Sequence, residues 1–134
     1  MVLRVAIVDD SAEVRDLWRA ALAADAAFEV CGECADGRSA VDLATGLQPD
    51  IMLLDLSMPD MGGLEALPLI RSASPGTRVV VLSAFGRRRF AQQAGDLGAA
   101  GFLEKHHPID TLCRRLLGVL DGEPVGDHPT FGPG

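Results

Sequence analysis

The sequence has no tyrosine, one tryptophan and few cysteines among its 134 residues. It also lacks any apolar run near the ~20 residues that a membrane-spanning helix needs, and Met1 leads directly into a strand-like segment with no signal-peptide pattern. We therefore expect a cytoplasmic protein that makes no contact with a membrane. The net charge of −7 leaves no basic face, so we expect no nucleic-acid contact by this domain itself.

Three cysteines are too few for a disulfide-rich fold, and a chain of this length needs no disulfide. Cys31 and Cys34 form a C-x-x-C pair, which is a redox centre in some proteins. Such pairs usually lie at the N-terminus of a helix, where the dipole lowers the thiol pKa. Here the pair falls within a predicted strand, where residues three apart point to opposite faces. We interpret both cysteines as small strand residues, and no second ligand pair at zinc-finger spacing accompanies them.

Five short apolar segments alternate with five amphipathic segments, in a composition that is 48% hydrophobic and 23% charged. The apolar segments are predicted strands because they are short, rich in Val, Leu and Ile, and bounded by turn residues. The predicted strands are Leu3 to Val8, Phe28 to Cys34, Ile51 to Leu54, Arg78 to Leu82 and Ala100 to Leu103. The predicted helices start after Ser11 and after Asp36-Gly37, and then cover Leu64 to Arg71, Arg87 to Leu97 and Ile109 to Leu120.

This alternation predicts an α/β fold of the flavodoxin-like type. We expect a doubly wound (βα)5 domain over residues 1–120, with a five-stranded parallel sheet in the order 2-1-3-4-5 and right-handed crossovers. Residues 121–134 carry three prolines and four glycines and few apolar residues. We expect this segment to be a linker stub or a disordered tail, because it cannot bury enough apolar surface to fold.

Polar residues stand at the carboxyl ends of four predicted strands. Asp9 and Asp10 follow the first strand and Asp55 follows the third, while Ser83 and Lys105 follow the fourth and fifth. In a sheet of the predicted order these ends meet at one edge, where open α/β sheets bind ligands. The sequence therefore predicts one polar site built from all of them.

The chemistry of this group favours phosphoryl transfer. Three carboxylates repel one another, and a hard divalent cation such as Mg²⁺ relieves that repulsion through oxygen ligands. Lys105 adds a fixed positive charge, and Ser83 adds a hydroxyl that can donate to an oxyanion. No histidine, cysteine or serine–base pair accompanies them to activate water. The set therefore favours attack of a carboxylate on phosphorus, which forms an aspartyl phosphate.

The motifs that carry these residues resemble the receiver domain of two-component response regulators, over nearly the whole predicted domain. The matching motifs are VDDS with Asp9 and Asp10, LLDLSMPDMGG with Asp55, VLSA with Ser83, and GAAGFLEK with Phe102 and Lys105. The segments DLSMPDMGGLEAL and VCGECADG are most similar to receivers that precede LuxR/NarL-type DNA-binding domains.

The resemblance implies a bacterial signalling switch that takes a phosphoryl group onto Asp55. The donor would be the phosphohistidine of a sensor histidine kinase, or a small phosphodonor. Asp10, Asp55 and the backbone carbonyl of Ser57 would bind Mg²⁺, with Asp9 assisting. The domain would catalyse its own phosphorylation and dephosphorylation, and we do not expect a turnover enzyme.

The resemblance also implies how the switch would move. Lys105 would contact the phosphoryl group, Ser83 would swing in to hydrogen-bond it, and Phe102 would turn inward as an aromatic switch. Ser57 and Phe85 would flank the mouth of the pocket. The fourth helix, fifth strand and fifth helix would form the surface for partner binding or homodimerisation. Both a stand-alone adaptor and a fragment that has lost a DNA-binding effector domain fit the sequence.

Three other functions compete with this one. A phosphorylation-independent interaction module with the same fold stays open. A phosphohydrolase of the haloacid-dehalogenase type needs a second acid two residues after its nucleophile, where Ser57 stands. A flavodoxin-like FMN module needs a phosphate-binding loop after the first strand, and the acids Asp9 and Asp10 would repel that phosphate.

Overall fold

The computed structural model describes residues 2–58, 61–83, 88–105 and 111–120, which form five strands and five helices. The strands are β1 (Leu3–Val8), β2 (Phe28–Cys34), β3 (Ile51–Asp55), β4 (Arg78–Ser83) and β5 (Gly101–Glu104). The helices are α1 (Ala12–Ala23), α2 (Gly37–Leu47), α3 (Gly63–Ala73), α4 (Arg88–Asp96) and α5 (Leu112–Leu120). Phe85 and the predicted tail, residues 121–134, lie outside the described residues.

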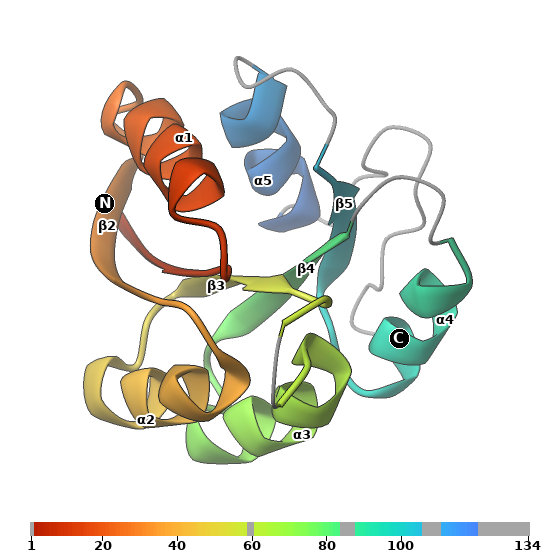
Figure 1. Ribbon diagram of the computed structural model, residues 1–134. Helices are drawn as coiled ribbons and strands as arrows, with labels where there is room; N and C mark the ends of the chain where they lie inside the picture. The colour runs from red at the N-terminus through yellow and green to blue at the C-terminus, as the bar shows by residue number, and fades with distance from the viewer. Residues whose placement is uncertain (1, 59–60, 84–87, 106–110, 121–134) are drawn as a thin grey trace.

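The strands form one parallel sheet in the order β2-β1-β3-β4-β5, which confirms the predicted topology. Helices α1 and α5 cover one face of the sheet, and α2, α3 and α4 cover the other (Figure 1). Every residue of β3 is buried, as expected for a central strand that is covered on both faces. No helix among the described residues has the length and apolar character to cross a lipid bilayer.

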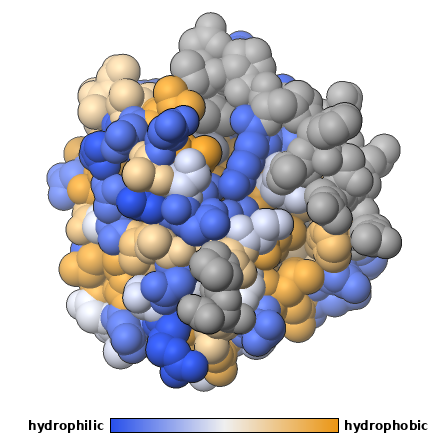
Figure 2. All heavy atoms as spheres, viewed as in Figure 1, coloured by the Kyte–Doolittle hydropathy of each residue, from blue (hydrophilic) through white to orange (hydrophobic). Residues whose placement is uncertain are grey.

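The core has two layers, because neighbouring residues of a buried strand point to opposite faces of the sheet. Met52 and Leu54 of β3 belong to the layer that packs against α2, α3 and α4. Ile51 and Leu53 belong to the layer under α1 and α5, which also contains the single tryptophan, Trp18. On the face shown in Figure 2, hydrophilic residues occupy much of the middle, between α1 and the pair α2 and α3.

The pairing of β1 with β2 contains one irregularity. Val5 pairs with Val30, but the next residue, Ala6, pairs with Gly32, so Cys31 is an extra residue in β2. Such a bulge shifts the alternation of side chains by one position. Each residue of β2 after Cys31 therefore points to the face opposite to the one that regular alternation predicts.

The bulge corrects the expectation for the cysteine pair. Cys31 and Cys34 both pack against the core layer next to α2, so the prediction that they point to opposite faces is wrong. Burial raises the pKa of the Cys31 thiol, and it raises the pKa of Cys34 to about 11. A thiol with a raised pKa is a poor nucleophile, so the surroundings of this pair oppose redox chemistry.

Candidate functional site

The site lies where the carboxyl ends of β1, β3 and β5 meet. Asp9 follows β1 and Asp55 ends β3, and their side chains are 0% and 1% exposed. Lys105 follows β5 and places its Nζ 2.8 Å from Asp9 Oδ2 and 3.1 Å from Asp55 Oδ1. One ammonium thus bridges two buried carboxylates that come from different strands.

Asp10 adds a third, exposed carboxylate to this edge of the sheet. One carboxylate oxygen from each of Asp9, Asp10 and Asp55 lies within 4.8 Å of the other two. The three acids outnumber the one lysine, so the group carries an excess of negative charge. A close group of oxygen ligands with this excess of negative charge suits a hard divalent cation such as Mg²⁺.

The two oxygens of Asp55 have different surroundings. Oδ1 accepts a hydrogen bond from the backbone N–H of Ser57 at 3.1 Å and contacts Lys105. Oδ2 is buried and has no hydrogen-bond partner among the described residues. A buried carboxylate oxygen without a partner is unfavourable, so Oδ2 is available to a cation or to an incoming electrophile.

The surroundings of Asp55 raise its pKa to about 6. Burial is the main cause, and the negative charge of Asp9 adds to it. The Ser57 N–H and the positive charge of Lys105 act in the opposite direction without cancelling these effects. Asp55 is therefore ionised at neutral pH, but its charge is poorly stabilised until a cation arrives.

Lys105 keeps its charge in spite of its position. Burial disfavours the ammonium, but the hydrogen bond and the charge of Asp9, together with those of Asp55, outweigh burial and raise the pKa of Lys105. The backbone N–H of Lys105 also donates to the carbonyl of Ser83 at 2.9 Å. Lys105 is thus hydrogen-bonded through its backbone to the end of β4, while its side chain pairs with the two acids.

Ser83 and Phe102 lie on the neighbouring strands β4 and β5. Ser83 ends β4 and is 1% exposed, and Phe102 on β5 is completely buried in the core layer next to α4. The hydroxyl-bearing Ser57 is exposed just past β3. The structure therefore brings the predicted residues of β1, β3, β4 and β5 to one edge, with Phe85 outside the described residues.

Gly63 is a residue of the site whose importance the sequence does not reveal. A Cβ atom at this position would lie 2.3 Å from the carbonyl oxygen of Asp55 and 2.9 Å from the Cα of Leu56. Only glycine lets α3 begin so close to the end of β3. The Gly62-Gly63 pair predicts a helix start, but the contact with the backbone of Asp55 becomes visible only in the folded chain.

The model of the response regulator receiver domain family matches residues 5–117 of this chain. An uncharacterised transcriptional regulatory protein of Bacillus subtilis, YxjL, is 34% identical over 125 residues, which cover 93% of this chain and 56% of that protein. The chain thus spans about half the length of this relative.

Solved structures show the same likeness. The signal receiver domain of the response regulator NarL from Mycobacterium tuberculosis superposes with a TM-score of 0.83 at 34% identity, over 91% of this chain and 98% of that one. A chain of the CheX–CheY–BeF₃–Mg²⁺ complex from Borrelia burgdorferi superposes with a TM-score of 0.82 at 28% identity, over 88% and 89% of the two chains.

Proposed function

We propose that this chain, which belongs to the response regulator receiver domain family, takes a phosphoryl group onto Asp55 in a reaction that requires Mg²⁺. The observation that carries the proposal is the state of the Asp55 carboxylate. It is buried at the end of the central strand, one oxygen is held by Ser57 and Lys105, and the other has no hydrogen-bond partner among the described residues. Such a carboxylate is oriented, ionised at neutral pH and poorly neutralised, which are the properties of a nucleophile that works beside a cation.

The residues fit a divalent cation because Asp55 Oδ2 is orphaned beside two further carboxylates. We infer that Asp10 and Asp55 bind the ion together with the backbone carbonyl of Ser57, and that Asp9 assists. A bound Mg²⁺ supplies positive charge to the oxygens of the phosphoryl group. The likeness to a structure that contains CheY with BeF₃ and Mg²⁺ supports this assignment.

The reaction needs no proton from the protein. An ionised oxygen of Asp55 attacks phosphorus, and the bond from phosphorus to the donor breaks with its electron pair leaving on the donor. The product is an acyl phosphate on Asp55. Lys105, which already contacts Asp55, places its ammonium where negative charge gathers on the phosphoryl oxygens.

We further propose that a sensor histidine kinase is the donor, in the cytoplasm, and that phosphorylation shifts the conformation of the β4 and β5 ends. The backbone N–H of Lys105 donates to the Ser83 carbonyl. A phosphoryl group that attracts Lys105 would therefore also pull on the end of β4 that carries Ser83. Phe102 would serve as the aromatic switch behind them. A nearly complete population shift needs about 5.5 kcal/mol of differential stabilisation, and several charge-assisted hydrogen bonds to the phosphoryl group can supply much of it.

The surface formed by α4, β5 and α5 is the proposed output of the switch. It would bind a partner or a second copy of the chain. Because the chain spans about half of a transcriptional regulator that it resembles, an attached DNA-binding effector is one proposed reader of the switch. A stand-alone receiver that binds another protein is the other.

The site favours neither the phosphohydrolase nor the FMN-binding module. The position two residues after Asp55 holds the exposed Ser57, which provides no acid to protonate a leaving group in a turnover reaction. Trp18 belongs to α1 and is buried in the core layer between that helix and the sheet, so it is not available to stack on a flavin.

The test is intact-protein mass spectrometry after incubation with Mg²⁺ and acetyl phosphate. We expect one added phosphoryl group on the parent chain, none on Asp55→Asn, and none when EDTA removes the cation. Asp42→Asn, which changes an exposed acid on α2, is the matched control and should react like the parent. No addition to the parent would instead indicate an interaction module that works without phosphorylation, and addition to Asp55→Asn would place the acceptor elsewhere.

A further inference from the structure

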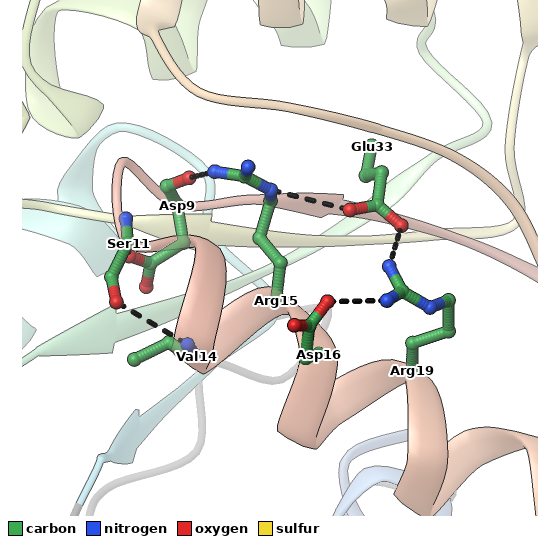
Figure 3. Close-up of polar contacts among 7 residues, drawn as sticks. All are labelled: Asp9, Ser11, Val14, Arg15, Asp16, Arg19 and Glu33. Carbon is green, nitrogen blue, oxygen red and sulfur yellow. Dashed lines mark hydrogen bonds and ion pairs between the residues drawn. The ribbon is translucent and has the colours of Figure 1, made fainter.

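A chain of polar contacts links the site to the edge strand β2 through helix α1 (Figure 3). Arg15 donates from Nη1 to the backbone carbonyl of Asp9 at 2.6 Å and from Nε to Glu33 Oε1 at 3.2 Å. Arg19, one helical turn later, binds the other oxygen of Glu33 and also Asp16. The Arg15 and Glu33 side chains are only 20% and 30% exposed, so this contact is partly shielded from water.

The bulge at Cys31 is the reason that Glu33 can reach α1. With the bulge, Glu33 lies beside Ile7, whose side chain belongs to the core layer under α1 and α5. Without the extra residue, Glu33 would lie beside Val8, whose side chain belongs to the layer next to α2. The irregularity thus turns the carboxylate toward Arg15 and away from α2.

The contact with Arg15 completes the immobilisation of Asp9. The backbone N–H of Asp9 donates to the Cys34 carbonyl at 3.1 Å, and its Oδ1 accepts from the Ser11 N–H at 2.9 Å. Its Oδ2 contacts Lys105 at 2.8 Å. The remaining acceptor, the Asp9 carbonyl, belongs to the peptide that joins Asp9 to Asp10, and it accepts the hydrogen bond from Arg15.

We propose that Arg15 is a positioning residue for Mg²⁺. By holding the carbonyl of the Asp9–Asp10 peptide, it fixes the backbone from which the exposed Asp10 carboxylate reaches the ion. Glu33 in turn keeps the guanidinium in place from β2. The inference rests on the proposed function, since it concerns the affinity of the same site for its cation.

Charge and positioning predict opposite effects of Arg15 on Mg²⁺ binding. A guanidinium beside the site repels a cation, so its removal should strengthen Mg²⁺ binding if electrostatics dominate. If Arg15 acts by positioning, its removal should weaken binding in spite of the favourable change in charge. When a residue that orients a metal ligand without binding the metal itself is removed, the affinity for the metal typically falls by about ten- to a hundredfold.

The experiment is a Mg²⁺ titration of the ¹⁵N-labelled full chain, followed by amide chemical shifts, for the parent, Arg15→Met and Arg19→Met. Methionine keeps an apolar stem and removes the donors. Arg19→Met is the matched control, because it removes the same charge and another contact of Glu33 but touches no part of Asp9. We expect the Kd for Mg²⁺ to rise about tenfold in Arg15→Met and to stay within about twofold of the parent in Arg19→Met.

Phosphorylation by acetyl phosphate provides a second readout. In Arg15→Met the Mg²⁺ concentration needed for half-maximal rate should rise, while the rate at saturating Mg²⁺ stays within about twofold of the parent. If Arg15→Met does not give a folded spectrum, Arg15→Lys replaces it. Lysine keeps the charge but cannot reproduce the two-point geometry of the guanidinium, so its Kd should rise at least about threefold.

The outcomes separate this inference from the proposed function. Unchanged or tighter Mg²⁺ binding in Arg15→Met, with normal phosphorylation of the parent, would overturn the role of Arg15 alone. Equal losses in Arg15→Met and Arg19→Met would also overturn it, because the contact with Asp9 would then be irrelevant. A parent chain that neither binds Mg²⁺ nor accepts a phosphoryl group would overturn both.

Discussion

Asp55→Asn should stabilise the protein when no divalent cation is present. Burial and the negative charge of Asp9 raise the pKa of Asp55 to about 6 from 3.8, so the folded chain binds this proton more tightly than the unfolded chain does. Between about pH 4 and pH 6 the folded state therefore carries more protons, and the stability that this group contributes falls as the pH rises. Asparagine is neutral at every pH, so it removes the free-energy cost of holding an ionised carboxylate in this buried position.

The magnitude follows from the two pKa values. The difference between 3.8 and about 6, at about 1.4 kcal/mol per pKa unit, gives an upper value of about 3 kcal/mol at pH 7.5. We expect Asp55→Asn to raise the free energy of unfolding by about 1 to 3 kcal/mol at this pH. At pH 4.5 the same two pKa values give Asp55→Asn a gain in stability of only about 1 kcal/mol, because the Asp55 carboxyl of the folded parent is largely protonated at that pH.

Urea unfolding in EDTA, at both pH values, measures this effect. The emission of Trp18 is a suitable signal, because it is the single tryptophan and is 3% exposed in the folded chain. Asp42→Asn serves again as the control, and an exposed site of this kind should change stability by less than about 0.5 kcal/mol. An Asp55→Asn variant no more stable than the parent at pH 7.5, or a gain as large at pH 4.5, would refute the destabilising effect of the buried Asp55 charge.

Two further predictions concern residues that contact Asp55. Lys105→Met should raise the pKa of Asp55 further, because it removes a positive charge that lowers it, and phosphorylation should slow by about tenfold or more. Carboxyl ¹³C shifts and the acetyl phosphate reaction measure the two effects, and an unchanged pKa would contradict the first. Gly63→Ala should lower the free energy of unfolding in urea by about 1 to 3 kcal/mol, because its Cβ meets the Asp55 carbonyl. Gly46→Ala, where a Cβ meets nothing within 4 Å, should not destabilise the chain, and equal losses in both variants would refute the role of the contact.

The sequence alone determined the fold class and the strand order. Apolar runs such as Ile51–Leu54 are too short for helices and too continuous for a half-exposed strand, so they predict a covered parallel sheet. Once the order is known, the acids that follow the first and third strands must meet at one edge. Their convergence with Lys105 is a consequence of topology, and topology follows from local pattern and short connections.

What only the tertiary structure decided depends on contacts between residues distant in the chain. The bulge at Cys31 has no local signal, because it reflects how β2 pairs with β1, and it alone turns Glu33 toward Arg15. In the same way, the raised pKa of Asp55 requires its burial beside Asp9, and the need for glycine at position 63 requires the backbone of β3 to lie against it. Local sequence sets the period of each segment, whereas register, burial and close approach arise only when separate segments pack together.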